Sequence, residues 1–377
     1  MRSFRLPKDL RNYIISIILG CALFAMPAIL SAAVIFFASI PNADTFHVLA
    51  RAAGLLPSPT LPVTLVRIDE STFKTWGRPF PMEKARIAEL LEVVRPTKPA
   101  AILVDFDLSA TTPTDDVSRL TKVLNEWTAS DPPLLIPKRL DIGAFEVTMK
   151  PDFIDDYVGK DKPIYRVNLL FERGDDIKIR NWNLWETPKG ACEALLSPQL
   201  LLFLLDSARQ DDLKAIASHL ADRDRLGNRP ENCSPSTTGH DLSWVNGLHK
   251  NAASDFVFGA TDATHPAFGD VSFPNGVGPV PALTQWSAET FRDKKIIPEV
   301  FAGRYIIIGA SHLASGDFHD TPAGEMEGMR IVANAIAISS VTLTVGLLAT
   351  ILAVDSFVEL FKDFFPRKGW RSLLKDK

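Results

Sequence analysis

Two long apolar stretches without charged residues lie near the two ends of the chain, and they constrain its architecture more than any other feature. Residues 14–40 and 331–354 contain no Asp, Glu, Lys or Arg, while the rest of the 377 residues has a mixed composition. A helix needs about 20 consecutive apolar residues to cross a bilayer, and both stretches exceed that length. The sequence therefore predicts a folded domain held at a membrane by a helix at each end.

Each stretch also has a second interpretation. Basic residues precede the first stretch and small residues lie inside it, as in a cleaved signal peptide. The apolar part of a signal peptide is only about 7–15 residues long, so we favour a retained anchor. The second stretch contains Ser, Thr and Asn, and its alternative is a buried core helix. The basic residues from Lys362 to Arg371 that follow it favour a span.

Charge then predicts the orientation. Lys and Arg gather in residues 1–13 and 358–377, whereas the middle of the chain carries the acidic excess. Basic flanks stay in the cytoplasm, so we expect both termini inside and the middle outside. The acidic balance of the middle argues against a nucleic-acid partner, which requires a basic face. The expected organisation is a cytoplasmic N-terminus (1–13), a transmembrane helix (14–40), an extracytoplasmic domain (41–338), a second transmembrane helix (339–357) and a cytoplasmic tail (358–377).

The middle of the chain reads as an α/β domain. Residues 63–69 and 100–106 are apolar runs typical of strands that are buried on both faces. Residues 83–94 and 115–127 carry apolar side chains at helical spacing, and residues 134–136 begin another strand. This alternation predicts an open, mainly parallel sheet with helices on both faces, to which residues 305–308 add a further strand.

The remaining segments are more varied. Residues 165–171 and 177–182 flank a short turn that contains Gly174, and this pattern predicts an inserted hairpin. Ser197 and Pro198 are the N-cap and first residue of an expected helix. Residues 223–252 read as a long polar surface loop, and residues 255–259 as a short strand.

The cysteines allow two outcomes. Cys21 lies in the first apolar stretch, and Cys192 and Cys233 lie in the middle domain. Outside the cytoplasm such a pair can form a disulfide. The alternative is two buried thiols, and the sequence does not choose between them.

Acidic residues follow the predicted parallel strands. Ligands of open parallel sheets bind beyond the carboxyl ends of the strands, so we expect these residues to share one rim and to form a ligand site. The candidate ligand-binding residues are Asp69, Asp105, Asp107, Asp317 and Thr321. A metal site built from Asp317, His319 and Asp320 is a less favoured alternative, because no metal-binding spacing is present. No motif for a cofactor or for catalysis is found.

The closing segment, residues 301–336, resembles the end of CHASE2 domains. The shared features are Gly303-Arg304, the apolar strand that ends in Ile308-Gly309-Ala310, Asp317, Thr321-Pro322-Ala323-Gly324, Gly328 and Ala333-Asn334. The opening segment from Val66 and the hairpin with Asn168 and Arg180 are similar as well. The usual Pro-x-Pro-Arg sequence is replaced by Pro79-Phe80-Pro81-Met82.

This resemblance implies an extracytoplasmic sensor domain of a bacterial inner-membrane protein, with the bulk of the chain periplasmic or extracellular. Its ligand is expected to be a small molecule or a peptide. Only about 20 residues follow the second span, so output is expected to pass to a separate membrane or cytoplasmic effector, and a homodimer is compatible with the sequence. The alternatives are a metal-dependent envelope enzyme and a structural subunit of the envelope.

Overall fold

The computed structural model describes only part of the chain. The described residues belong to one compact unit, Pro57–Lys377. The two predicted membrane spans, residues 14–40 and 339–357, lie outside the described residues. No helix among the described residues combines the length and apolarity needed to cross a membrane. The described ranges are 61–109, 116–143, 146–159, 161–173, 177–207, 210–225, 230–233, 242–248, 250–253, 270–271, 280–292, 301–321 and 324–337.

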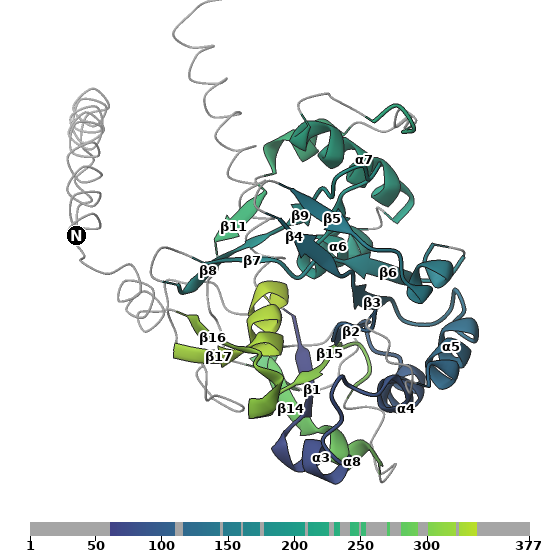
Figure 1. The fold of residues 1–377 in the computed structure, drawn as a ribbon, viewed down its shortest axis with the longest axis vertical. Coiled ribbons are helices and arrows are strands. Elements are labelled where there is room, and N and C mark those ends of the chain that lie inside the picture. Colours follow the sequence, from purple (N-terminus) through teal and green to yellow (C-terminus); the bar gives the residue numbers. More distant parts are fainter. Residues whose placement is uncertain are drawn as a thin grey trace, which may run out of the picture. The chain divides into compact units, whose positions relative to one another are not determined.

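A six-stranded sheet with the order β14–β1–β15–β2–β3–β6 forms the centre of the domain (Figure 1). Every neighbouring pair in it is parallel, which confirms the predicted mainly parallel α/β fold. The last of these strands in the sequence, β15, lies between the two that come first. The strands are β1 (Val63–Ile68), β2 (Ala101–Asp105), β3 (Leu134–Pro137), β6 (Ile164–Val167), β14 (Leu283–Ser287) and β15 (Tyr305–Ala310).

Helices cover each face of the sheet. Successive side chains of a strand point to opposite faces, so the apolar strands have side chains to bury on both. Leu65 and Ile307 join one core with α6 and with the final helix, which spans residues 328–337. Val66 and Ile308 join a second core with α4 and α5 on the other face. The helices are α3 (Glu70–Thr75), α4 (Lys84–Val94), α5 (Ser118–Asn125), α6 (Pro198–Asp206), α7 (Leu213–Asp224) and α8 (Ala288–Arg292).

Short antiparallel pairs and 3₁₀ turns complete the described part of the fold. The strands pair as β4 (Leu140–Ile142) with β5 (Val147–Met149), β7 (Phe171–Arg173) with β8 (Ile179–Asn183), β8 with β11 (Asn251–Ala253), β9 (Trp185–Glu186) with β10 (Leu195–Leu196), β12 (Asp270–Val271) with β13 (Val280–Pro281), and β16 (Phe318–Thr321) with β17 (Gly324–Glu327). The 3₁₀ turns are η1 (Arg95–Thr97), η2 (Phe153–Tyr157), η3 (Gln210–Asp212), η4 (Ser243–Gly247) and η7 (Leu313–Ser315).

The inserted hairpin differs from its prediction. The run 165–171 is not one strand of a hairpin, because its first residues belong to β6 at the edge of the parallel sheet and only Phe171 onward pairs with β8. The break follows Asn168, whose buried side chain donates to the Leu195 carbonyl oxygen at 2.7 Å. The hairpin is therefore β7–β8, a separate element that follows the sheet.

Other segments also depart from the expectations. Residues 223–252 are not entirely loop, because α7 extends to Asp224, η4 buries Val245, and β11 pairs with β8. The edge strand β14 was not anticipated at all; its sequence Leu-Thr-Gln-Trp-Ser lacks a continuous apolar run. Residues 255–259 lie outside the described part of the chain.

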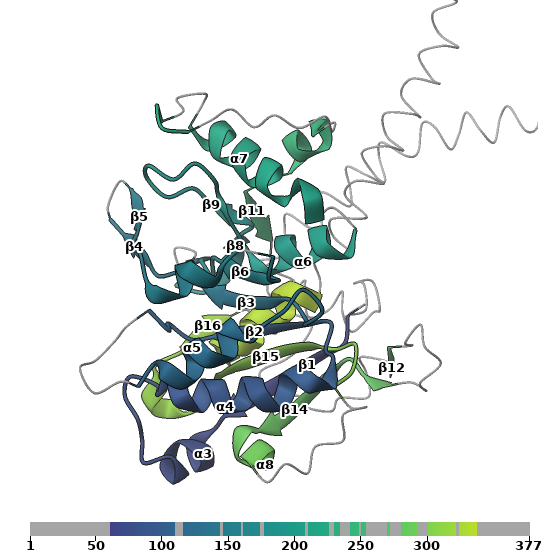
Figure 2. The ribbon, with the colours of Figure 1, turned by 90° about the vertical axis from the view of Figure 1, so that its right-hand side faces the viewer.

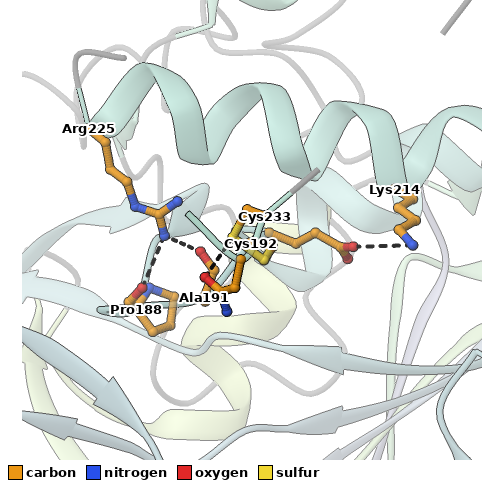
Figure 3. Close-up of a disulfide and its surroundings, with 8 residues drawn as sticks. Pro188, Ala191, Cys192, Lys214, Arg225 and Cys233 are labelled. Atoms are coloured by element: carbon orange, nitrogen blue, oxygen red, sulfur yellow. Dashed lines mark hydrogen bonds and ion pairs between the residues drawn. A yellow bond between two sulfur atoms is a disulfide. The ribbon is translucent and has the colours of Figure 1, made fainter. Parts of the chain in front are cut away.

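A disulfide joins Cys192 to Cys233, with 2.11 Å between the sulfurs and a sequence separation of 41 (Figure 3). The loop that carries Cys192 is also attached to the end of α7, because the Arg225 guanidinium donates to the carbonyl oxygens of Pro188 and Ala191. These contacts fix the loop before β10 against α7, at the side of the domain where β6 ends the sheet.

Candidate functional site

The site begins with a row of three residues at the carboxyl ends of the central strands. Arg67 on β1 is in register with Gly309 on β15, and Gly309 is in register with Asp105 on β2. The residue before each of them belongs to the second core. Successive strand residues point to opposite faces, so all three residues of the row lie on the face of the first core, which the final helix covers. A cation, a glycine and an acid thus share one row.

The glycine in this row lets the final helix approach the sheet. A Cβ atom at Gly309 would lie 2.9 Å from Met329 Cβ and 3.3 Å from Asp105 Cβ. The first distance is shorter than real Cβ contacts, so only glycine fits without a shift. The final helix therefore starts directly over β15 and beside Asp105.

A second glycine brings Asp317 to the start of the same helix. A Cβ atom at Gly328 would lie 2.2 Å from Oδ2 and 2.4 Å from Oδ1 of Asp317. The Gly328 amide also donates to the Asp317 carbonyl oxygen at 2.9 Å. The N-terminus of a helix favours a negative charge, so the first turn of the final helix helps to hold this carboxylate.

Asp105 and Asp317 form the unusual electrostatic feature of the site. Burial raises the pKa of Asp105 to about 8, and the like charge of Asp317 adds to the effect. Within the described residues the Asp105 carboxylate has no hydrogen-bond donor and no cation paired with it. With its pKa raised to about 8, Asp105 is mostly protonated at neutral pH and loses its proton as the pH rises through 8.

A polar chain leads from Asp317 to the β7–β8 hairpin. Asp317 Oδ1 lies 2.9 Å from His319 Nε2, and His319 Nδ1 lies 3.3 Å from Arg173 Nη2. In the tautomer that carries its proton on Nε2, His319 donates to Asp317 and accepts from Arg173. The acid at the helix start is therefore connected through one histidine to β7.

Arg67 is a residue of the site that sequence reasoning missed. Its guanidinium donates to Ser311 at 3.1 Å, Gln285 at 3.0 Å and Glu327 at 2.6 Å. Ser311 directly follows β15, Gln285 lies on β14, and Glu327 is the last residue of β17, directly before the final helix. A cation in an otherwise apolar parallel strand was the available signal, because such a charge requires partners.

Two of the predicted acids have local structural roles. Asp69 caps α3 and accepts from the Thr72 amide and hydroxyl, each at 2.8 Å. Partial burial by itself raises the pKa of Asp69, but the bonds from Thr72 and Ser287 and the charge of Arg67 lower it overall. Asp107 is exposed, accepts from Ser109 and lies 3.5 Å from Arg139. Both acids follow sheet strands, as predicted.

Thr321 and Asp320 belong to the β16–β17 hairpin and not to the row at the strand ends. The Thr321 hydroxyl donates to the Gly324 carbonyl oxygen at 2.6 Å and closes the hairpin turn. Thr321 is four positions along the chain from Asp317, which is about 13 Å in an extended strand. His319 and Asp320 are successive strand residues, so their side chains point to opposite faces. No group of three or more metal-binding side chains occurs in the described part of the chain.

The arginine of the closing motif lies at the amino ends of the central strands, opposite the rim that holds the site. Arg304 precedes β15 and donates to Thr64 Oγ1 at 2.6 Å and to the Val63 carbonyl oxygen at 2.8 Å. Burial lowers the pKa of Arg304 to about 10. This arginine holds β1 and β15 together and does not contribute to the site.

A second group of charges lies at the carboxyl ends of β3 and β6. Lys138 Nζ lies 2.5 Å from Asp155 and 3.3 Å from Asp152, and Arg166 also pairs with both acids. The side chains of Lys138, Arg166 and Asp152 are almost fully buried. Sequence reasoning missed this group, because its members are spread over residues 138–166 without a motif.

The chain was compared with known proteins. A family model described as the CHASE2 domain matches residues 22–350, which is most of the chain. No similar curated protein and no similar solved structure was found.

Proposed function

Because the chain belongs to the CHASE2 family of extracytoplasmic sensor domains, we propose that it is a non-catalytic sensor whose signal enters at Asp105 and Asp317. The observation that carries this proposal is the packing of the final helix on the site. Gly309 meets Met329, and Gly328 meets Asp317, with no room for a Cβ atom. A change at the acids therefore displaces the start of that helix.

The chemistry of the two acids defines the ligand class. A ligand that approaches Asp105 displaces the water molecules that hydrate its carboxylate. The ligand must replace their hydrogen bonds, so it has to offer hydrogen-bond donors or a positive charge. Protonation itself is the smallest such event. A small molecule or a peptide side chain that carries an amine or amide meets the same requirement.

The route of the signal follows the final helix. Residues 328–337 lead into the predicted span at 339–357, and we propose that this span moves with the helix. The proposed setting is a bacterial inner membrane with both termini in the cytoplasm, a first span at 14–40, and a separate effector protein or a second copy of the chain as the receiver.

Reporter fusions test the proposed orientation. A reporter that is active only in the periplasm should be active after residue 150 and inactive after residue 377. Activity after residue 377 would mean that the second stretch does not cross the membrane, and the proposed signal route would then be wrong.

Maleimide labelling tests the coupling between the acids and the span. The full-length chain is used with Cys21→Ser and Ser340→Cys, which leaves the Cys192–Cys233 disulfide in place. Asp105→Asn should change the labelling rate of the new cysteine severalfold in intact cells. Asp107→Asn, an exposed acid at the same rim, is the matched control and should leave the rate unchanged. Equal rates in all three proteins would contradict the coupling.

A further inference from the structure

A cleft of about 990 Å³ lies beside the free edge of β6, away from the acids of the proposed sensor site. Its walls come from β6, the end of β5, the loop that carries Cys192, and helices α6 and α7. Asp69, Asp105, Asp107, Asp317 and Thr321 do not line it. Figure 2 shows α7 set apart from the edge of the sheet at this side of the domain.

The main chain of β6 has one donor and one acceptor on this side that bond to no other described residue. The Leu134 amide donates to the Pro163 carbonyl oxygen at 2.7 Å, and the Lys138 amide donates to that of Val167 at 2.9 Å. In a parallel strand, the main-chain N–H and C=O groups of alternate residues point to opposite neighbouring strands. Those of Tyr165 therefore also face β3, and those of Arg166 face outward.

The neighbours of Arg166 on the outer side are already engaged. The Ile164 amide donates to the Lys162 carbonyl oxygen at 2.8 Å, and the Asn168 amide donates to that of Leu196 at 3.0 Å. Among the described residues nothing bonds to the outward amide and carbonyl of Arg166. An N–H and a C=O side by side on a strand edge are complementary to the main chain of another strand.

The walls of the cleft suit alternating side chains. On the side formed by β10, α6 and α7, the lining residues Leu196, Leu201 and Ala217 are apolar. On the other side, the Arg166 guanidinium is almost fully buried and its Nη1 has no hydrogen-bond partner within the described chain. The charged lining residues include both signs, for example Asp161 and Lys214.

We propose that this cleft binds an extended, uncharged peptide segment of another protein, which adds to β6 as a further strand. The peptide main chain bonds to Arg166, one apolar side chain enters the wall of Leu196, Leu201 and Ala217, and the next side chain offers an acceptor to the guanidinium. This site is separate from the proposed sensor site, so neither depends on the other.

Fluorescence anisotropy with full-length protein in nanodiscs tests the proposal. The probes are labelled heptapeptides of alternating apolar and Asn residues, with Val, Ile, Leu or Phe at the centre. We expect at least one to bind, and N-methylation of its central amides should weaken binding at least tenfold, because main-chain bonding is lost. No binding by any probe, or equal binding of the methylated peptide, would overturn the proposal.

Variants at the mouth of the cleft locate the site. Lys214 is exposed and lines the cleft, so changing it should not disturb folding. Lys214→Trp should weaken peptide binding at least tenfold by covering the cleft, and the matched variant Lys214→Ala should bind within twofold of wild type. The Arg166 amide should exchange its proton more slowly when the peptide is bound. Binding that Lys214→Trp leaves unchanged would place the peptide elsewhere and refute the proposed site.

Discussion

The same rim of the sheet holds two groups of acids that differ in their partners. At β3 and β6, Asp152 and Asp155 lie between Lys138 and Arg166, so every charge has an opposite charge within 4 Å. At β2 and β15, Asp105 lies near Asp317, another acid, and the pKa of Asp105 is raised to about 8. Both groups are at strand ends, where an α/β sheet binds ligands.

The difference distinguishes a scaffold from a site. Paired buried charges hold segments together, and removing one partner leaves an uncompensated charge. An unpaired acid with a raised pKa destabilises its surroundings and is common at functional sites. A position at the carboxyl ends of the strands therefore does not by itself identify the sensing residues. The acid of the sensing site is distinguished by having no cation paired with it among the described residues. The following predictions test this comparison.

Asp152→Asn should have the largest effect, on the scaffold group. It removes the charge that Lys138 and Arg166 share, and the loss of free energy of unfolding should be about 3–5 kcal/mol. Denaturant unfolding of the full chain measures it, with the exposed Asp156→Asn as the matched control. A loss below about 1 kcal/mol would mean that the pairs do not hold this part of the fold.

Gly328→Ala should destabilise the protein by about 1–3 kcal/mol, because its Cβ would overlap the Asp317 carboxylate. Asp317→Ala removes the overlapping atoms. In that background the same glycine change should therefore cost much less. A double-mutant cycle measures the coupling. Additive effects would show that the helix start and the acid are independent.

Asp105→Asn should stabilise the protein at high pH. A folded-state pKa raised from 3.8 to about 8 means that the wild type is most stable below about pH 4 and loses this contribution as the pH rises through 8. Because the carboxylate is partly exposed, we expect a gain of on the order of 1–2 kcal/mol at pH 8. The gain should vanish at pH 4. Asp107→Asn is the control and should show no such trend.

Asp317→Asn should have the smallest effect, a lower pKa of Asp105. It removes the like charge, which is the second cause of the raised pKa after burial. Carbon-13 NMR titration of Asp105 measures the change. An unchanged titration would mean that burial alone sets the pKa and that the two acids do not act as a pair.

Much of the architecture could be predicted from the sequence, because the central strands of a parallel sheet have continuous apolar sequences. Val63–Ile68 and Tyr305–Ala310 are buried almost throughout, and both were predicted. The edge strand β14 was missed, since one side of an edge strand is not covered by sheet and its residues are mixed. The order that places β15 between β1 and β2 depends on contacts between distant segments.

The site was predictable only in part. Asp105 and Asp317 were identified from their positions after strands, but the same rule also selected Asp69, which caps α3, and Thr321, which closes a hairpin. Position along the chain does not reveal hydrogen-bond partners. The pairing of Arg67 with Glu327 joins residues 260 apart, and only the fold brings them together.

Hydrogen exchange of the full chain tests the central claim most directly, namely that the acids at β2 and β15 control the start of the final helix. Wild type and Asp105→Asn are compared at pH 9, where the wild-type acid, whose pKa is raised to about 8, is largely charged. Slower exchange confined to residues 324–337, with residues 164–170 of the scaffold side unchanged, is the predicted result. No difference at residues 324–337, or the same slowing in both segments, would contradict the account.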